Sequence, residues 1–88
     1  MAPYELRFRP AAVRDLERRS PILLQRIDER IRALGEDPRS VGSMKMSGLD
    51  AYRSRVGDHR VVYEIDDRAR IVTITRIRHR REVYRKLR

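Results

Sequence analysis

The sequence predicts an α+β fold in which a helical hairpin packs on one face of a small, largely antiparallel sheet. Alternating apolar residues near the start are typical of a strand, and two segments of helical periodicity follow them. From position 52 onward the chain returns to the alternation of strands. At 88 residues the chain is smaller than a typical domain, so we expect one domain over residues 1–88. The predicted order is β-α-α-β-β-β, followed by a short helix or tail over residues 81–87.

The first strand is predicted where Tyr4, Leu6 and Phe8 alternate with charged residues, which places their side chains on a buried face. Pro10 then suits the first turn of a short helix that ends before Arg18. This helix is amphipathic, so it needs an apolar surface on which to lie.

A second, longer helix is predicted after Ser20, which suits the N-cap, and Pro21, which suits the first helical turn. Apolar residues recur at steps of three and four down one face, and Gly35 and Pro38 end the pattern. Two successive amphipathic helices make a hairpin, and both need a sheet on which to bury their apolar stripes. Breaker residues dominate 37–50, so this segment is predicted to be a surface loop.

Three more strands are predicted in the second half of the chain. Residues 52–56 and 60–65 alternate in polarity and are separated by a Gly-Asp turn. An Asp-Asp turn then precedes residues 70–78, which are rich in β-branched side chains. That composition predicts an interior strand with both faces partly covered.

Charge is the strongest signal in the composition. The chain has 22 basic and 13 acidic side chains, a formal net charge of +9, and all but two of the basic residues are arginine. Residues 41–88, which form most of the predicted sheet, carry +7 of this charge. A guanidinium binds phosphate through a planar fork of donors and stays charged, so the composition predicts a polyanionic partner. A genome-wide preference for arginine codons would produce the same composition.

The residues that the sequence lacks disfavour other classes of function. There is no cysteine, and only His59 and His79 could supply imidazole ligands. We therefore expect no disulfide, no protein-built transition-metal site and no cofactor. No run approaches the roughly 20 apolar residues of a membrane span, and the N-terminus lacks the pattern of a signal peptide. We expect a cytoplasmic protein without a membrane partner.

Strand alternation predicts that one face of the sheet is basic. Arg53 and Arg55 point to the same side of their strand, and Arg60 follows just past the turn, where it can join them. Arg80 and Arg81 add charge near a C-terminal tyrosine. A basic face with aromatic side chains is typical of proteins that hold single-stranded RNA. The alternative is a solvated charged face, but like charges crowded on one face cost stability unless an anion meets them.

Two motifs resemble those of a known family. Residues 52–63 read Y-R-S-R-V-G-D-H-R-V-V-Y, and residues 79–84 read H-R-R-E-V-Y. In combination they resemble the RelE toxins of bacterial and archaeal type II toxin–antitoxin modules, and the resemblance covers essentially the whole chain. It implies a RelE-like fold and a small ribonuclease that enters the ribosomal A site, cuts mRNA there and halts translation.

The resemblance also implies roles for individual residues. Arg60 matches the arginine that stabilises the scissile phosphate, Arg80 the basic residue near the leaving oxygen, with Arg81 as the alternative match, and Tyr84 the C-terminal tyrosine. The implied reaction is a metal-free attack of the ribose 2′-hydroxyl on the adjacent phosphate, which leaves a 2′,3′-cyclic phosphate and a 5′-hydroxyl. The predicted catalytic residues are Arg55, Arg60, His79, Arg80 and Tyr84, and the predicted RNA-binding residues are Lys45, Arg53, Arg55, Arg78 and Arg81.

The sequence leaves the general base open. Some relatives place lysines where Arg53 and Arg55 stand, and an arginine with a pKa above ~12 is a poor base. The candidates are His79, Glu64 and Tyr84. Each also has a simpler interpretation: an exposed turn histidine, a structural ion-pair partner and a core aromatic residue, respectively.

The resemblance implies a cognate acidic, RelB-like antitoxin that covers the arginines. The ribosomal A site and mRNA would be the targets, and operator DNA would be bound only through the antitoxin complex. Two alternatives remain. One is a ParE-like toxin of the same fold that binds DNA gyrase without cleaving RNA, and the other is a non-toxic relative that binds only RNA or its antitoxin.

Overall fold

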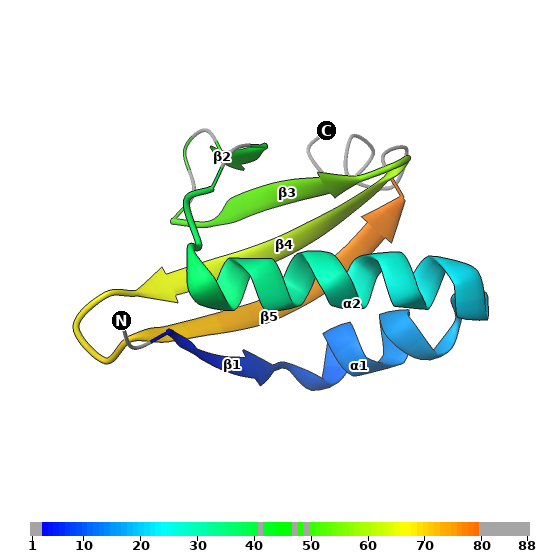
Figure 1. Cartoon of the computed structure of the whole chain (residues 1–88), viewed down its shortest axis with the longest axis horizontal. Coiled ribbons are helices and arrows are strands. Elements are labelled where there is room, and N and C mark those ends of the chain that lie inside the picture. Colours follow the sequence, from blue (N-terminus) through cyan, green and yellow to red (C-terminus); the bar gives the residue numbers. More distant parts are fainter. Residues whose placement is uncertain (1–2, 41, 47, 49, 80–88) are drawn as a thin grey trace.

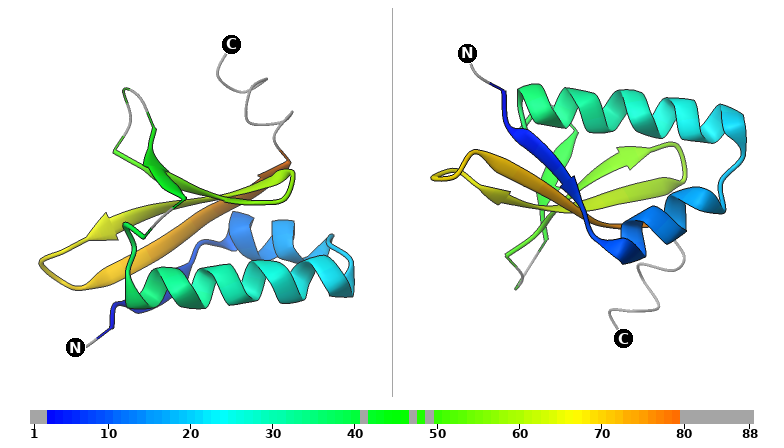
Figure 2. Two further views of the ribbon diagram at one scale, coloured as in Figure 1. Left: turned by 45° about the horizontal axis from the view of Figure 1, so that its top comes forward. Right: turned by 90° about the horizontal axis from the view of Figure 1, so that it is seen from below.

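A five-stranded sheet and two helices make up the described part of the structure, a computed structural model that describes residues 3–40, 42–46, 48 and 50–79. The strand order is β1-β5-β4-β3-β2, in which β1 is parallel to β5 and every other pair is antiparallel. Both helices cover the same face of the sheet (Figure 1; Figure 2), which confirms the predicted α+β fold. The elements are β1 (Glu5–Phe8), α1 (Pro10–Glu17), α2 (Pro21–Glu36), β2 (Ser43–Lys45), β3 (Tyr52–Val56), β4 (His59–Asp66) and β5 (Ile71–His79).

Helix α2 begins at the predicted N-cap, where the side chain of Ser20 accepts a hydrogen bond from the backbone N–H of Leu23 at 3.3 Å. The helix ends at Glu36, between the predicted stop residues Gly35 and Pro38, and Gly35 lies in its last turn. A Cβ atom at position 35 would lie 3.3 Å from Cγ of Leu6, so the missing side chain lets β1 approach α2 closely.

The core lies between the helices and the face of the sheet that they cover. Alternation in β4 follows the prediction, since Val61 and Tyr63 are fully buried. The Tyr63 hydroxyl donates to the backbone carbonyl of Pro38 at 2.6 Å, so this buried phenol is satisfied. Fully burying a large apolar side chain contributes about 1.5–3 kcal/mol to folding. The buried apolar residues are Ala12, Ile27, Ile31, Leu34, Val56, Val61, Tyr63, Val72, Ile74 and Ile77.

Two local expectations were wrong. Ser43–Lys45, inside the predicted loop, form β2 by pairing with residues 52–54 of β3. Three residues are too short for periodicity to reveal, so only the pairing defines this strand. Phe8 was expected on a buried face but is 42% exposed, because β1 is an edge strand that ends there. The helix or tail predicted over 81–87 lies outside the described residues.

A register shift between β4 and β5 decides which arginines face away from the helices. The pairing skips one residue of β5 at Thr75. Strict alternation from the buried Ile74 would direct Arg76 and Arg78 to the helix-covered face. The shift instead brings Ile77 into the core and leaves both arginines on the opposite face, which we call the open face.

Neither of the helices in the described ranges is long and apolar enough to cross a membrane.

Candidate nucleic-acid interface

Three arginines stand side by side across the open face. The register pairs Arg55 of β3 with Arg60 of β4, and Arg60 with Arg78 of β5. Directly opposed residues on one face have Cβ atoms about 4.5–5.5 Å apart, so three cationic side chains share one band of the sheet. We call Arg55, Arg60 and Arg78 the arginine row. The structure thus brings together three of the residues that the sequence predicted for the site.

A second row lies next to the first and contains Arg53 of β3, Val62 of β4 and Arg76 of β5. The Arg53 guanidinium contacts the sulfur of Met44 at 3.4 Å, so it lies toward β2. Sequence reasoning did not single out Arg76. The signal was present, since strict alternation from Ile74 would have sent two charged side chains into the core.

Asp15 of α1 holds the end of β5 and binds Arg76. This carboxylate is only 4% exposed and accepts hydrogen bonds from the Ile77 backbone N–H at 2.9 Å and from Arg76 Nε at 2.8 Å. Burial by itself would raise the pKa of Asp15, but the hydrogen bonds from Arg76 and Ile77 lower it below the ordinary value. Asp15 therefore fixes helix α1 against the sheet and neutralises one arginine of the second row.

A hollow of about 380 Å³ opens between β2 and the arginine row. Arg60 lies in its wall and is only 4% exposed. Among the described residues, neither Arg55 nor Arg60 forms an ion pair. A buried cation is costly unless an anion or several hydrogen bonds meet it, and the hydrogen bond from Arg60 Nη1 to the His59 carbonyl is long, at 3.5 Å. The hollow is lined by Gly42, Ser43, Met44, Arg53, Arg55 and Arg60, and it can accept a phosphate.

The other end of the open face is acidic. A hollow of about 570 Å³ is lined there by Asp50, Glu64, Asp66 and Asp67, with Arg7 as its basic member. Glu64 lies on the same face as Arg60, as predicted, and forms an ion pair of 3.4 Å with Arg9. Among the described residues of the open face, basic side chains therefore predominate at the end that carries the arginine row, and that end attracts a polyanion.

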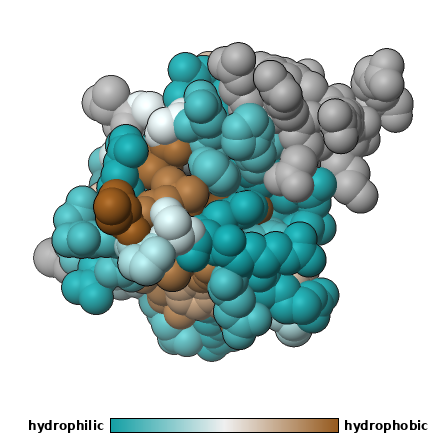
Figure 3. Space-filling view, turned by 90° about the vertical axis from the view of Figure 1, so that its right-hand side faces the viewer, coloured by the Kyte–Doolittle hydropathy of each residue, from teal (hydrophilic) through white to brown (hydrophobic). Residues whose placement is uncertain are grey.

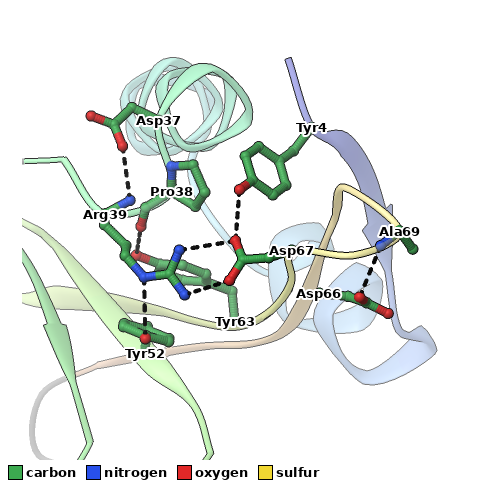
Figure 4. Close-up of polar contacts among 9 residues, drawn as sticks. All are labelled: Tyr4, Asp37, Pro38, Arg39, Tyr52, Tyr63, Asp66, Asp67 and Ala69. Carbon is green, nitrogen blue, oxygen red and sulfur yellow. Dashed lines mark hydrogen bonds and ion pairs between the residues drawn. The ribbon is translucent and has the colours of Figure 1, made fainter. Parts of the chain in front are cut away.

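A polar network closes this acidic end of the molecule (Figure 4). The guanidinium of Arg39 donates to both carboxylate oxygens of Asp67 at 3.0 Å, and the Tyr4 hydroxyl donates to Asp67 at 2.6 Å. Hydrogen bonds from Arg39 and Tyr4 lower the pKa of Asp67 to about 2. Arg39 Nε also donates to the Tyr52 hydroxyl at 3.3 Å. Tyr52, whose ring stacks on Tyr63, therefore belongs to this network and not to the arginine row.

His79 is not brought together with Arg55 and Arg60. It pairs with His59, and the two rings meet edge to face with centroids 5.2 Å apart. Because His59 pairs with the buried Val56, alternation places both histidines on the helix-covered side of the sheet.

The remaining predicted residues lie elsewhere. Lys45 of β2 pairs with Tyr52, so alternation places it on the opposite side from Met44 and Arg53. Arg80, Arg81 and Tyr84 lie outside the described residues.

The fold and the arginine row define a small α+β protein with a basic sheet face, and comparisons with known proteins agree. Residues 6–84 match the family described as the ParE toxin of the type II toxin–antitoxin system, parDE. The chain is 34% identical over 86 residues to Toxin RelG of Mycobacterium tuberculosis, a match that covers 96% of this chain and 99% of RelG. It therefore belongs to the RelE/ParE family of type II toxins, as the motifs predicted.

Solved structures support the same assignment. The toxin–antitoxin complex RelBE2 from Mycobacterium tuberculosis contains a chain that matches with a TM-score of 0.77 and 33% identity, over 88% of this chain and 98% of that one. The intact RelBE complex of E. coli gives a TM-score of 0.76 at 20% identity, over 86% of this chain and 95% of that one, and this likeness concerns the fold alone.

Proposed function

We propose that this toxin is an endoribonuclease that cuts mRNA in the ribosomal A site and so halts translation in the cytoplasm. The observation that carries the proposal is Arg60, a buried arginine without an ion pair in the described chain, at the centre of the arginine row. Such a cation is suited to meet a phosphate. The resemblance of the motif that contains it to RelE toxins supports mRNA as the source of that phosphate.

The proposed chemistry is attack of a ribose 2′-oxygen on the adjacent phosphorus atom. The bond from phosphorus to the 5′-oxygen of the next nucleotide breaks, and the products are a 2′,3′-cyclic phosphate and a 5′-hydroxyl. Negative charge accumulates on the phosphoryl oxygens during this step. Cations already held in place, such as Arg55 and Arg60, stabilise that charge without reorganisation. Removal of one such group is expected to lower the rate about 10²–10³-fold, as the removal of an oxyanion-hole donor does.

The proton of the 2′-hydroxyl needs an acceptor, and the leaving 5′-oxygen needs a donor. Glu64, His79 and Tyr84 remain the proposed candidates for the base, and Arg80 or Arg81 would lie near the leaving oxygen. Glu64→Gln, His79→Asn and Tyr84→Phe each remove one candidate at nearly constant volume. A general base acts only in its deprotonated form, so the variant that loses the acidic limb of the pH dependence of cleavage identifies the base.

The proposed activity is tested with purified protein, ribosomes carrying a defined mRNA, and mapping of the cut ends. Arg60→Met keeps most of the side-chain volume and removes the charge, so the fold is retained while the cleavage rate falls about 10²–10³-fold. Arg32→Ala is the matched control, since Arg32 is an exposed arginine of α2 that is paired with Asp28 at 3.0 Å. Intact mRNA in the presence of folded wild-type protein would refute the proposal.

A second candidate function is favoured by the family match itself, which carries the description of a ParE toxin. A ParE-like protein of this fold would bind DNA gyrase and leave RNA intact. Inhibition of gyrase supercoiling by the purified chain, with translation unaffected, would establish this alternative.

We also propose a partner, an acidic RelB-like antitoxin. The solved relatives include complexes of RelE with RelB. This chain offers both charge for an acidic segment and apolar surface, with Ile22 76% exposed at the start of α2 and Val13 43% exposed on α1. Figure 3, which looks at the end of the molecule where the two helices are joined, shows apolar surface set among hydrophilic side chains. Co-purification with the product of an adjacent reading frame tests this partner.

A further inference from the structure

A second hollow lies on the other side of β3, between this strand and helix α2. Its volume is about 440 Å³, and it is lined by Arg26, Glu29, Arg30, Ala33, Arg55, Val56 and Gly57. Three of these side chains are arginines and one is a carboxylate. Arg55 lines both this hollow and the hollow of the open face, so the two hollows share this residue.

Two of the three arginines of α2 lie close to the sheet edge. Arg26 and Arg30 are four residues apart, so they lie one turn apart on the same side of α2. The Arg26 guanidinium comes within 3.8 Å of the position a Cβ would take at Gly57, and that of Arg30 within 3.9 Å of the same position at Gly42. The two side chains thus reach the turn after β3 and the turn before β2.

Strand β2 does not cover this part of the edge. It pairs with β3 only over residues 52–54, so Arg55 and Val56 lie beyond the last paired residue. A chain that occupied the open face could therefore pass over the edge of β3 at Arg55 and reach Arg26 and Arg30 without crossing another strand of the described structure.

The arginines that line the two hollows, which together form a basic strip, have no ionic partner within the described part of the chain. Among the described residues, none of Arg26, Arg30, Arg53, Arg55 and Arg60 forms an ion pair, although Glu29 lines the same hollow as the first two. Arg32 on the same helix shows the contrast, since it is paired with Asp28. Like charges four residues apart destabilise a helix, so the pair at 26 and 30 has a cost that an external anion would offset.

We propose that single-stranded RNA runs from the open face over the edge of β3 at Arg55, and that Arg26 and Arg30 bind phosphates of the same strand outside the cleavage site. The proposal rests on the proposed function, because it extends the path of the RNA that the arginine row holds. An RNA backbone fits this strip because phosphates repeat along it and arginine binds each one through a planar fork.

The experiment measures RNA binding by fluorescence anisotropy with the full chain, using oligoribonucleotides of about 4 and about 12 nucleotides, a range that single-strand sites commonly span. The double variant Arg26→Ala/Arg30→Ala binds the longer RNA about tenfold more weakly, and its slope of log affinity against log salt falls by about 1.4, the value for two phosphate contacts. The loss is smaller for the short RNA. Glu29→Gln removes the one acidic side chain of the hollow and strengthens binding.

Arg14→Ala/Arg18→Ala is the matched control, because these two exposed arginines of the α1 region have the same spacing and the same total charge. It leaves the affinity for both RNAs close to that of the wild type. Circular dichroism and thermal unfolding confirm that each variant is folded.

Three results would overturn the proposal. These are equal losses in both double variants, equal losses for short and long RNA, or a loss seen only with an acidic antitoxin peptide, which would assign the strip to protein. Failure of the proposed function is a separate result, since it is read from mRNA cleavage with Arg60→Met and not from RNA affinity. Absence of any RNA binding by folded wild-type protein would likewise overturn the proposed path of the RNA, whereas the proposed cleavage on the ribosome would still be judged by its own assay.

Discussion

The two ends of the open face differ in how their charged side chains are paired. At the end next to the turn between β4 and β5, Arg39 is bound by Asp67, and Glu64 is bound by Arg9. At the end next to the turn between β3 and β4, Arg55 and Arg60 form no ion pair in the described chain. Charges of the first kind stabilise the fold, whereas charges of the second kind cost stability and await an external anion.

The largest expected effect concerns Arg60. If the arginine row is the site of phosphate binding, Arg60→Met lowers the rate of mRNA cleavage about 10²–10³-fold and leaves the protein folded. Arg60→Lys keeps the charge but loses the planar fork, so it restores only part of the rate. Equal cleavage rates for wild type and Arg60→Met on ribosome-bound mRNA would show that the arginine row is not the site of phosphate binding, and the functional contrast between the two ends would be lost.

The second effect concerns Asp15, which binds Arg76 and so neutralises one arginine of the second row. Asp15→Asn removes the charge from a carboxylate that is only 4% exposed, and we expect the free energy of unfolding at pH 7 to fall by about 1–3 kcal/mol. Urea denaturation of both proteins measures the difference. Glu17→Gln, which changes an exposed acidic residue of the same helix, is the control and has little effect.

The pH dependence of that difference identifies its cause. Because the folded-state pKa of Asp15 is lowered from 3.8, its contribution is present above that value and is lost as the pH falls through the lowered pKa. The difference in free energy of unfolding between wild type and Asp15→Asn therefore becomes smaller at acidic pH. A gap that stays constant from pH 7 to pH 3 would show that packing, and not the charge, is responsible.

The third effect has opposite signs at the two ends. Arg55→Ala removes one like charge from the arginine row, so the free energy of unfolding rises by about 0.2–1 kcal/mol at low salt. Arg39→Ala removes the ionic partner of Asp67 and therefore lowers the free energy of unfolding. The same substitution thus separates a functional arginine from a structural one. Thermal unfolding at low ionic strength provides the measurement, and a fall in both variants would contradict the assignment of Arg55.

The sequence predicted most of this architecture because its signals are local. The N-cap at Ser20, the proline at position 21 and the alternation around Val61 and Tyr63 each depend on neighbouring residues. Local signals of this kind were sufficient to place both helices and four of the five strands in the described residues. The alternation of Arg53 and Arg55, with Arg60 beyond the turn, placed the basic face.

The remaining features arise from pairing between distant segments. Strand β2 exists only because Ser43–Lys45 meet β3. The register shift at Thr75 depends on β4, and it alone decides that Arg76 and Arg78 face the open side. The pairing of Arg39 with Asp67 joins a loop to a turn 28 residues away, which no periodicity could indicate. For the same reason, a strip that continues from the sheet to Arg26 and Arg30 of α2 could not be predicted.

The smallest expected effect concerns Asp67 at the acidic end of the open face. Hydrogen bonds from Arg39 and Tyr4 lower the pKa of Asp67 from 3.8 to about 2, so its contribution to stability is complete above 3.8 and is lost as the pH falls toward 2. Because Asp67 is exposed, salt screens part of this contribution, and Asp67→Asn lowers the midpoint of thermal unfolding less than Asp15→Asn does. The difference between Asp67→Asn and wild type shrinks in high salt, whereas the loss in Asp15→Asn persists because Asp15 is buried. A salt-independent effect at both positions would mean that packing, and not charge, holds the acidic end.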